Sequence, residues 1–438
     1  MPQSFSSPSL LARLSRLAAI ETHETPAAAA AFALFFFMWA GYFAVRPVRE
    51  TVGTLIGREQ LAHLWIVTAI VSVLIIPLYG VIVARFRRSA FLPWTYAAVT
   101  AVLAAIGVAL QAGGVHSLIA KFFYVFISVA NLFLLSMFWS FLLELFDAGQ
   151  AKRLFGVIAA GGSAGALTGP LVSDMSVNAI GNGGVLLIGA GFFTVAIFCQ
   201  RLLLRIWKAR PSGLAQDQPL GGALFAGVGL ILRSPYLLGI ALFIVMISTV
   251  NTLLYFEQLR LVEASFAEPT ARTRVFARLD WIVQTLTVLS QVFLTGRIAR
   301  KFGVIALITF VPLLMVVGFA ALAISGTFAV LAVVFVLRRA CEYAFIRPGR
   351  EMLWSPLDAE TKYKAKNTID VPVYRGADAL AAQLNNAISA LGAGSVAMLG
   401  VAISAAWAMI GWRLSRRFEQ HAARGAAPEA RNVRASNS

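Results

Sequence analysis

Charged residues are scarce in this chain of 438 residues: Asp, Glu, Lys and Arg together make up 13%. Soluble domains carry about 25%, so this shortage excludes a chain of two or three ordinary soluble domains. Hydrophobic residues make up 59% and come in blocks that are long enough, as helices, to cross about 30 Å of hydrocarbon. The sequence therefore predicts an all-α membrane protein with many spans.

Cysteine and histidine are also rare. Cys199 and Cys341 lie in predicted spans and the four histidines are scattered, which excludes a disulfide framework and leaves no metal-ligand spacing. The sequence contains no paired nucleophile and base and no phosphate loop. We therefore expect no enzymatic activity, no metal and no cofactor.

Acidic residues number 20 against 37 basic residues, so the net charge is +17. In a soluble protein this excess would indicate nucleic-acid binding. Here most basic residues fall in alternate short connections between spans, which the positive-inside rule assigns to the cytoplasm. We therefore expect a bilayer protein with no nucleic-acid partner and with both termini cytoplasmic.

The apolar blocks predict twelve spans in two six-helix halves. We expect a cytoplasmic leader without a cleavage site over residues 1–26, an N-terminal half over 27–207 and a C-terminal half over 234–420. Residues 208–233 are expected to form a cytoplasmic linker with a short interfacial helix, and residues 421–438 a disordered cytoplasmic tail. The spans are expected to begin near Ala27, Leu61, Phe91, Leu118, Leu154, Gly183, Tyr236, Arg274, Val304, Phe328, Thr368 and Gly394.

Three local matches at nearly one offset support an internal repeat. They pair Gly80 with Gly296, Trp139 with Trp354, and Tyr42 with Tyr255, at offsets of 216, 215 and 213. Parallel six-span halves related by an axis along the membrane normal are the architecture of the major facilitator superfamily. The glycine-then-basic loops after the second and eighth spans resemble that superfamily's signature loop.

Three charged residues interrupt the first span. Arg46, Arg49 and Glu50 share one helix face, at i, i+3 and i+4, and Pro47 permits a kink beside them. A charge inside a bilayer costs several kcal/mol unless it faces protein or a water-filled cavity. These residues are therefore candidates for a substrate site; the alternative is that they mark the outer mouth of the span and pair locally.

The tenth span repeats this pattern, since the string Arg-Pro-x-Arg-Glu occurs in both spans. Arg338 and Arg339 stand in mid-span, and Arg347 and Arg350 follow. Guanidinium groups bind phosphate and carboxylate in bidentate fashion, so these four arginines are predicted to bind an anionic substrate. The alternative for Arg347 and Arg350 is an ordinary role at the cytoplasmic end of the span.

Further polar residues inside predicted spans are candidates for coupling or gating, or for hydrogen bonds and charge pairs between helices. The pair Arg375 and Asp378 is one such expected charge pair. The set comprises Glu144, Glu257, Asp280, Glu342, Arg375 and Asp378. A separate small-residue face, made by Gly161, Gly165 and Gly169, predicts close helix packing.

The region after the tenth span resembles the ATP/ADP translocase family, also called the NTP/NDP exchange transporters. Its members carry a basic-Glu-Met string before an aromatic residue, then Pro-Leu-Asp, spaced lysines and Ile/Val-Asp. Here these positions are Arg350, Glu351, Met352, Trp354, Pro356, Leu357, Asp358, Lys362, Lys364, Lys366, Ile369 and Asp370, followed by Arg375 and Gly376. The Arg-Pro-x-Arg-Glu and Tyr-Arg-Gly strings look more like the branch found in free-living bacteria.

The resemblance implies twelve helices of facilitator type, a bacterial inner membrane and nucleotide exchange with Arg49, Glu50 and Arg350 at the site. We expect a monomer that moves a nucleotide or other organic anion by alternating access. One alternative is a proton-coupled facilitator of another metabolite, with Glu50 or Asp280 as proton carrier. A non-transporting membrane scaffold or lipid-handling protein is the other alternative.

Overall fold

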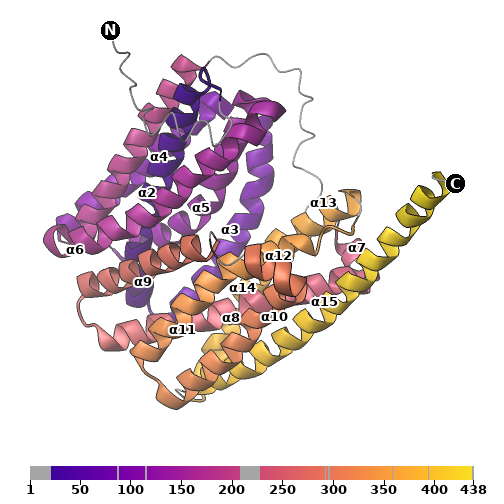
Figure 1. Ribbon diagram of the computed structural model, residues 1–438. Helices are drawn as coiled ribbons and strands as arrows, with labels where there is room; N and C mark the ends of the chain where they lie inside the picture. Colours follow the sequence, from indigo (N-terminus) through magenta and orange to yellow (C-terminus); the bar gives the residue numbers. More distant parts are fainter. Residues whose placement is uncertain are drawn as a thin grey trace, which may run out of the picture. The chain divides into compact units, whose positions relative to one another are not determined.

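The computed structural model describes residues 21–436, apart from 86–87, 114–115, 208–226, 292, 294–295, 358 and 393. The described chain is a succession of helices (Figure 1). They are α2 (Thr25–Ile56), α3 (Arg58–Arg85), α4 (Arg88–Gln111), α5 (Ser117–Leu145), α6 (Ala148–Ile206), α7 (Val228–Arg233), α8 (Pro235–Ser265), α9 (Pro269–Ser290), α10 (Gly296–Ser325), α11 (Phe328–Cys341), α12 (Arg347–Met352), α13 (Ala359–Thr368), α14 (Tyr374–Ser389) and α15 (Ser395–Ser436). Two π-helical turns, η2 (Glu342–Ile346) and η3 (Ile369–Val373), interrupt the later helices.

Among the described residues, eight helices are long and apolar enough to cross a membrane, with α6 counted once. The predicted all-α membrane class therefore agrees with the structure. The chain divides into two compact units. Unit 1 comprises residues 1–52, 81–218 and 268–281, and unit 2 comprises 53–80, 219–267 and 282–438. Each unit thus takes one segment from the opposite sequence half, and the boundaries at 27–207 and 234–420 remain a prediction.

In unit 1, helix α6 packs against α2 through the predicted glycine face. A Cβ atom added at Gly165 would lie 2.2 Å from the backbone oxygen of Phe36. At Gly161 the corresponding distance, to the backbone oxygen of Phe32, is 2.5 Å. Only glycine lets the two backbones approach this closely, so the predicted packing role of this face is confirmed.

Helix α6 is too long for one span, and its direction changes at Gly181. This residue has φ of 67° and ψ of 178° within the helix, a backbone conformation that favours glycine. The break falls in the segment 181–184, which the sequence predicts to connect two spans. The two parts of α6 therefore correspond to the predicted fifth and sixth helices.

One end of unit 1 carries an ion-pair cluster around Arg153. Its guanidinium contacts Glu24 at 2.5 Å and Glu21 at 3.1 Å, and the Glu24 side chain is fully buried. Nearby, Asp147 and Gln150 form a capping box at the start of α6. These contacts join the chain before α2 to the first turns of α6.

The Glu24 cluster predicts a loss of stability in acid. Burial favours the neutral acid, but the hydrogen bonds from Arg153 and from the Glu21 backbone outweigh it and lower the pKa of Glu24. A lowered pKa stabilises the fold above the ordinary value of 4.5, and this stabilisation is lost as the pH falls through the folded-state pKa. We expect the wild-type melting temperature to fall more steeply than that of Glu24→Gln between about pH 5 and about pH 3.

The exposed carboxylate of Glu419 supplies a matched control for this titration. The variant Glu419→Gln should follow the wild-type curve. Parallel curves for wild type and Glu24→Gln across the whole range would show that Glu24 contributes nothing to the acid transition.

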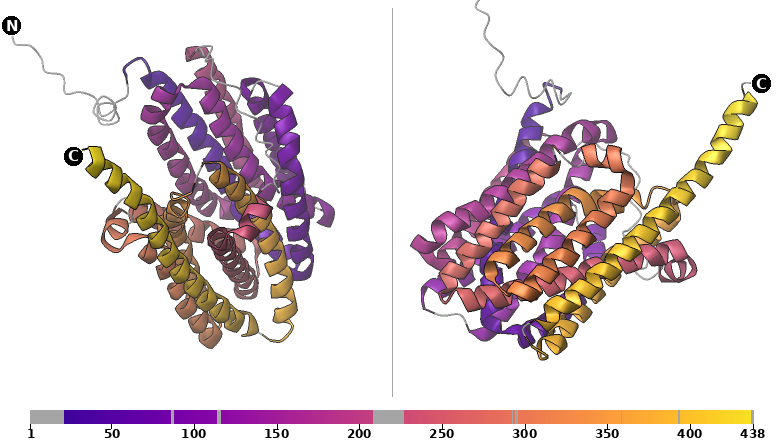
Figure 2. Two further views of the ribbon diagram at one scale, coloured as in Figure 1. Left: turned by 90° about the vertical axis from the view of Figure 1, so that its right-hand side faces the viewer. Right: turned by 60° about the horizontal axis from the view of Figure 1, so that its bottom comes forward.

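In unit 2, helix α8 packs against α11, α14 and α15, and α15 also lies along α10 (Figure 2). Trp354 and Trp407 are among the largest fully buried side chains, and the Tyr236 hydroxyl donates to the Leu353 carbonyl at 2.7 Å. Helix α15 continues to Ser436, where the sequence predicts a disordered tail from residue 421. The alanine and arginine residues of this segment have high helix propensity, which favours the longer helix.

Candidate functional site

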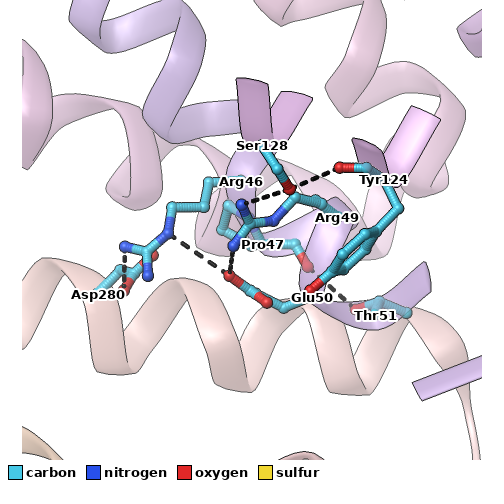
Figure 3. A network of polar contacts seen from close by, with 8 residues as sticks. All are labelled: Arg46, Pro47, Arg49, Glu50, Thr51, Tyr124, Ser128 and Asp280. Atoms are coloured by element: carbon cyan, nitrogen blue, oxygen red, sulfur yellow. Dashed lines mark hydrogen bonds and ion pairs between the residues drawn. The ribbon is translucent and has the colours of Figure 1, made fainter. Parts of the chain in front are cut away.

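The charged face of α2 forms one side of a polar network in unit 1 (Figure 3). Arg46 donates to both carboxylate oxygens of Asp280 on α9, at 3.0 and 3.1 Å, and its Nε lies 3.5 Å from Glu50. The side chains of Glu50 and Asp280 are only 5% and 6% exposed. The predicted substrate ligand Arg46 is therefore joined to a predicted gating residue.

Arg49 extends this network to α5. It donates to Glu50 through Nη2 and to the Ser128 hydroxyl through Nη1, at 3.2 Å. The Ser128 hydroxyl in turn donates to the Tyr124 carbonyl at 2.6 Å, and the Arg49 guanidinium lies over the Tyr124 ring, 5.4 Å from its centroid. Arg46, Arg49, Glu50 and Asp280 together carry no net charge.

A second set of contacts joins α2 and α9 to α6. The hydroxyls of Thr51 and Thr273 are 2.6 Å apart, and Thr273 donates to the Asn182 side chain at 2.7 Å. Asp174 on α6 accepts from Arg274 and Arg278, each at 3.1 Å. Asp174 is not among the residues predicted from the sequence, although a lone carboxylate within an apolar block is an available signal.

In unit 2, the arginines of α11 and the following turns have unequal partners. Arg338 is buried and pairs with Glu342 one turn later. Arg339 lies over the Phe335 ring at 5.4 Å, and Arg347 over the Tyr343 ring at 4.2 Å. Within the described part of the chain, Arg347 has no carboxylate at ion-pair distance, and Glu342 is the acidic residue that attracts it electrostatically. The turn η2, whose wider helical turn is often found at functional sites, separates these arginines.

Arg350 has only distant ion pairs. Its Nη2 lies 3.8 Å from Glu351 and 3.7 Å from Asp370, whereas Lys366 contacts Glu351 at 2.5 Å. The buried Nε of Arg350 has no hydrogen-bond partner among the described residues, and neither has the buried Oδ1 of Asp370. Arg350 thus keeps hydrogen-bond donors that its neighbours do not satisfy.

The remaining gating candidates fall into two groups. Arg375 and Asp378 lie 3.6 Å apart, which confirms the predicted pair, and Glu257 pairs with Arg260. In contrast, Glu144 has a buried Oε2 atom with no hydrogen-bond partner among the described residues. The predicted set is therefore spread over both units, and each unit brings together only its own members.

Comparison with known proteins finds a family match in the second part of the chain. Residues 223–418 match the model of the TLC ATP/ADP transporter family. The predicted family resemblance is confirmed. The matched residues 223–418 contain every candidate residue from Glu257 to Asp378, whereas the network around Arg46 also uses α2, which precedes them.

Two curated relatives of this chain are ADP,ATP carrier protein 1 of Chlamydia muridarum and of Chlamydia trachomatis. Each is 26% identical over 296 residues, which cover 58% of this chain and 55% of the relative. The chain thus spans about half the length of the curated relatives it matches.

Solved transporter structures share the fold. The nucleoside transporter NupG superposes with a TM-score of 0.62 at 14% identity, over 90% of this chain and 99% of that chain. A bacterial homologue of the iron transporter ferroportin gives 0.62 at 12% identity, over 89% and 98%. These similarities show a shared fold and carry no information about substrate.

One group outside residues 223–418 has the donor atoms of a metal site. Glu21, His23 and Glu24 place one ligand atom each within 4.8 Å of one another. Arg153 contacts both carboxylates, and the His23 ring stacks on Trp207 with 5.9 Å between centroids. The guanidinium already supplies the positive charge that these carboxylates need, so the group fits an ion-pair cluster.

Proposed function

We propose that this protein is a secondary transporter that exchanges a nucleotide, or another organic anion, across a bacterial inner membrane. The match of residues 223–418 to an ATP/ADP transporter family supports this proposal, as do two relatives named ADP,ATP carrier proteins. Eight apolar helices support a membrane location. Nucleotide specificity, a monomeric state and cytoplasmic termini belong to the proposal.

The incomplete pairing of Arg350 is the observation that carries the anionic substrate. Arg46, Arg49 and Arg338 each donate to a carboxylate that lies close by. Arg350 instead has ion pairs at 3.7 and 3.8 Å and a buried donor without a partner. A substrate phosphate would satisfy those donors, because a guanidinium fork matches two phosphate oxygens. Arg347 and Arg339 would add positive charge nearby.

The network around Arg46 is proposed to be an outer gate. It ties α2 and α6, from the first sequence half, to the segment 269–281 of the second half. If the positive-inside assignment holds, these contacts lie toward the outer surface, and alternating access requires them to break. Arg46, Glu50 and Asp280 then act as gate residues that exchange partners during the cycle.

Twelve spans in two halves also remain part of the proposal. The break at Gly181 divides α6 into two helices. The run from α11 through η2 to α12, and that from α13 through η3 to α14, would each supply one more span. This division would give twelve spans, the number that the sequence predicts.

The direct test is nucleotide exchange in proteoliposomes. Vesicles loaded with ADP should take up labelled ATP, and Arg350→Ala should reduce this uptake about 10- to 100-fold, as expected when a hydrogen bond to a charged group is lost. Arg350→Lys should retain part of the activity because the positive charge remains. Arg201→Ala, at an exposed position on α6, is the matched control and should transport normally.

Two outcomes would favour the other hypotheses. Absence of nucleotide uptake, together with proton-driven movement of another solute, would favour a proton-coupled facilitator. The observation that favours this alternative is the buried Oε2 of Glu144, which has no hydrogen-bond partner among the described residues. Failure to move any solute, by a protein shown to be folded, would favour the membrane scaffold or lipid-handling role.

A further inference from the structure

A compact group of oxygen atoms lies between α8 and α14, within unit 2. Asp378 on α14 faces Ser248 and Thr252, which stand one turn apart on α8. The hydroxyl of Ser248 also lies 3.2 Å from the carbonyl oxygen of Tyr374, one turn before Asp378. Ser248 and Thr252 are fully buried, and Asp378 is 7% exposed.

The protons available in this group are too few for its contacts. Three close oxygen–oxygen contacts involve the hydroxyls: Ser248 with Asp378, Ser248 with the Tyr374 carbonyl, and Thr252 with Asp378. Each hydroxyl has a single proton to donate, so two protons serve three contacts. One pair of oxygens is therefore left facing each other without a full hydrogen bond, which is unfavourable unless another positive charge lies among them.

Two of the three oxygen–oxygen separations fit a bound cation. Oxygen ligands of a hard cation lie about 2.3–2.6 Å from it, and neighbouring ligands in octahedral coordination then stand roughly 3.3–3.7 Å apart. The Thr252–Asp378 and Ser248–Tyr374 separations are 3.4 and 3.2 Å. The Ser248–Asp378 contact is shorter than a normal hydrogen bond, so these two oxygens must move apart before both can bind one cation.

The charge of the group favours a monovalent ion. Asp378 is its single carboxylate, and Arg375 lies 3.6 Å from the second oxygen, Oδ2, of that carboxylate. Divalent-cation sites commonly use several carboxylates, whereas this group has one, and Arg375 already balances part of its charge, so the group holds no more than a single added positive charge. The irregular turn η3 ends directly before Tyr374, and irregular helical segments are where transporters bind coupling ions.

A further acceptor lies beside the group. The buried Oδ1 of Asn251 has no hydrogen-bond partner among the described residues, while its Nδ2 donates to the Tyr374 hydroxyl at 3.4 Å. We propose that Asp378, Ser248, Thr252 and the Tyr374 carbonyl form a binding site for a monovalent cation, Na⁺, with Asn251 as an additional ligand. As a coupling site it rests on the proposed transport function, but binding of the ion does not.

The experiment is a thermal-stability titration of the purified, substrate-free chain. Choline chloride is replaced by NaCl, or by KCl, at constant ionic strength and pH. We expect Na⁺ to raise the wild-type melting temperature in a saturable manner and more than K⁺ does. Thr252→Val, which keeps the shape of the side chain, should raise the half-saturating Na⁺ concentration at least about tenfold. Asp378→Asn should remove the Na⁺ effect.

Thr249→Val is the matched control. Its hydroxyl is also buried on α8, but it donates within the helix, to the Val245 carbonyl at 2.8 Å, so this variant should respond to Na⁺ as the wild type does. The proposal is overturned if Na⁺, K⁺ and choline act alike on the wild type, or if Thr252→Val responds to Na⁺ unchanged. A melting temperature that depends on pH but not on Na⁺ would assign the missing charge to a proton on Asp378.

Two measurements, the Na⁺ dependence of the melting temperature and the Na⁺ dependence of nucleotide exchange, separate this site from the transport function. If Na⁺ binds but no nucleotide exchange occurs, the ion site stands and the proposed substrate fails. If exchange occurs at the same rate in choline and in Na⁺, and the melting temperature ignores Na⁺, the transport proposal stands and the ion site fails.

Discussion

The variant Gly165→Val is expected to lose the close packing of α2 against α6 and with it most folded protein. A Cβ atom at this position would stand 2.2 Å from the backbone oxygen of Phe36. A backbone oxygen within a helix cannot rotate away, so the two helices must separate. Overpacking commonly costs about 1–3 kcal/mol, and we expect more here because Gly161 and Gly169 also approach α2 closely, with 2.5 Å from an added Cβ atom to a backbone oxygen at each. The measurement is the yield of monodisperse protein in detergent and its melting temperature.

Gly156→Ala controls for the general effect of replacing a glycine in α6. A Cβ atom there would have no heavy atom within 4 Å, and alanine favours the helix. This variant should be at least as stable as the wild type. A Gly165→Val protein with an unchanged melting temperature would contradict the packing described for this helix pair.

Removal of the Glu50 carboxylate should also have a large effect on stability. In Glu50→Ala, Arg49 loses its carboxylate partner and Arg46 loses one of two. Breaking a buried pair from one side costs about 3–5 kcal/mol, because a charge remains buried. We expect a decrease of this size in the free energy of unfolding, measured by denaturant titration in micelles.

A double variant separates the structural role of Glu50 from its role in transport. Arg49→Met combined with Glu50→Leu removes both charges, and such replacements of buried pairs are often neutral for stability. Arg46 still has Asp280 in this variant. We expect restored stability without restored nucleotide exchange. Recovery of exchange would show that neither side chain has a role in the transport cycle.

The sequence was sufficient for features that depend on short separations. The helix periodicity placed Arg46 and Glu50 four residues apart on one face, and Arg375 and Asp378 three residues apart, and both pairs form. The glycine spacing likewise predicted the packing face of α6. These features follow from the helix repeat alone.

Partners distant in sequence could not be predicted in the same way. Asp280 was recognised as a candidate, but nothing in the sequence assigned it to Arg46, from which it is separated by 234 positions. Ser248 and Thr252 look like ordinary hydroxyl residues in an apolar helix, and only their packing against Asp378 distinguishes them. Such contacts depend on which helices become neighbours, and hydropathy does not determine this.

The assignment of residues 268–281 to unit 1 has a consequence for synthesis of the chain. Arg46 emerges from the ribosome long before Asp280, so α2 to α6 are made before one of the carboxylates that pair with their arginines. Glu50, one helical turn away, is the partner that Arg46 already has at that stage. Contacts of such long sequence separation form late in folding, so unit 1 reaches its final form only when α9 has been made.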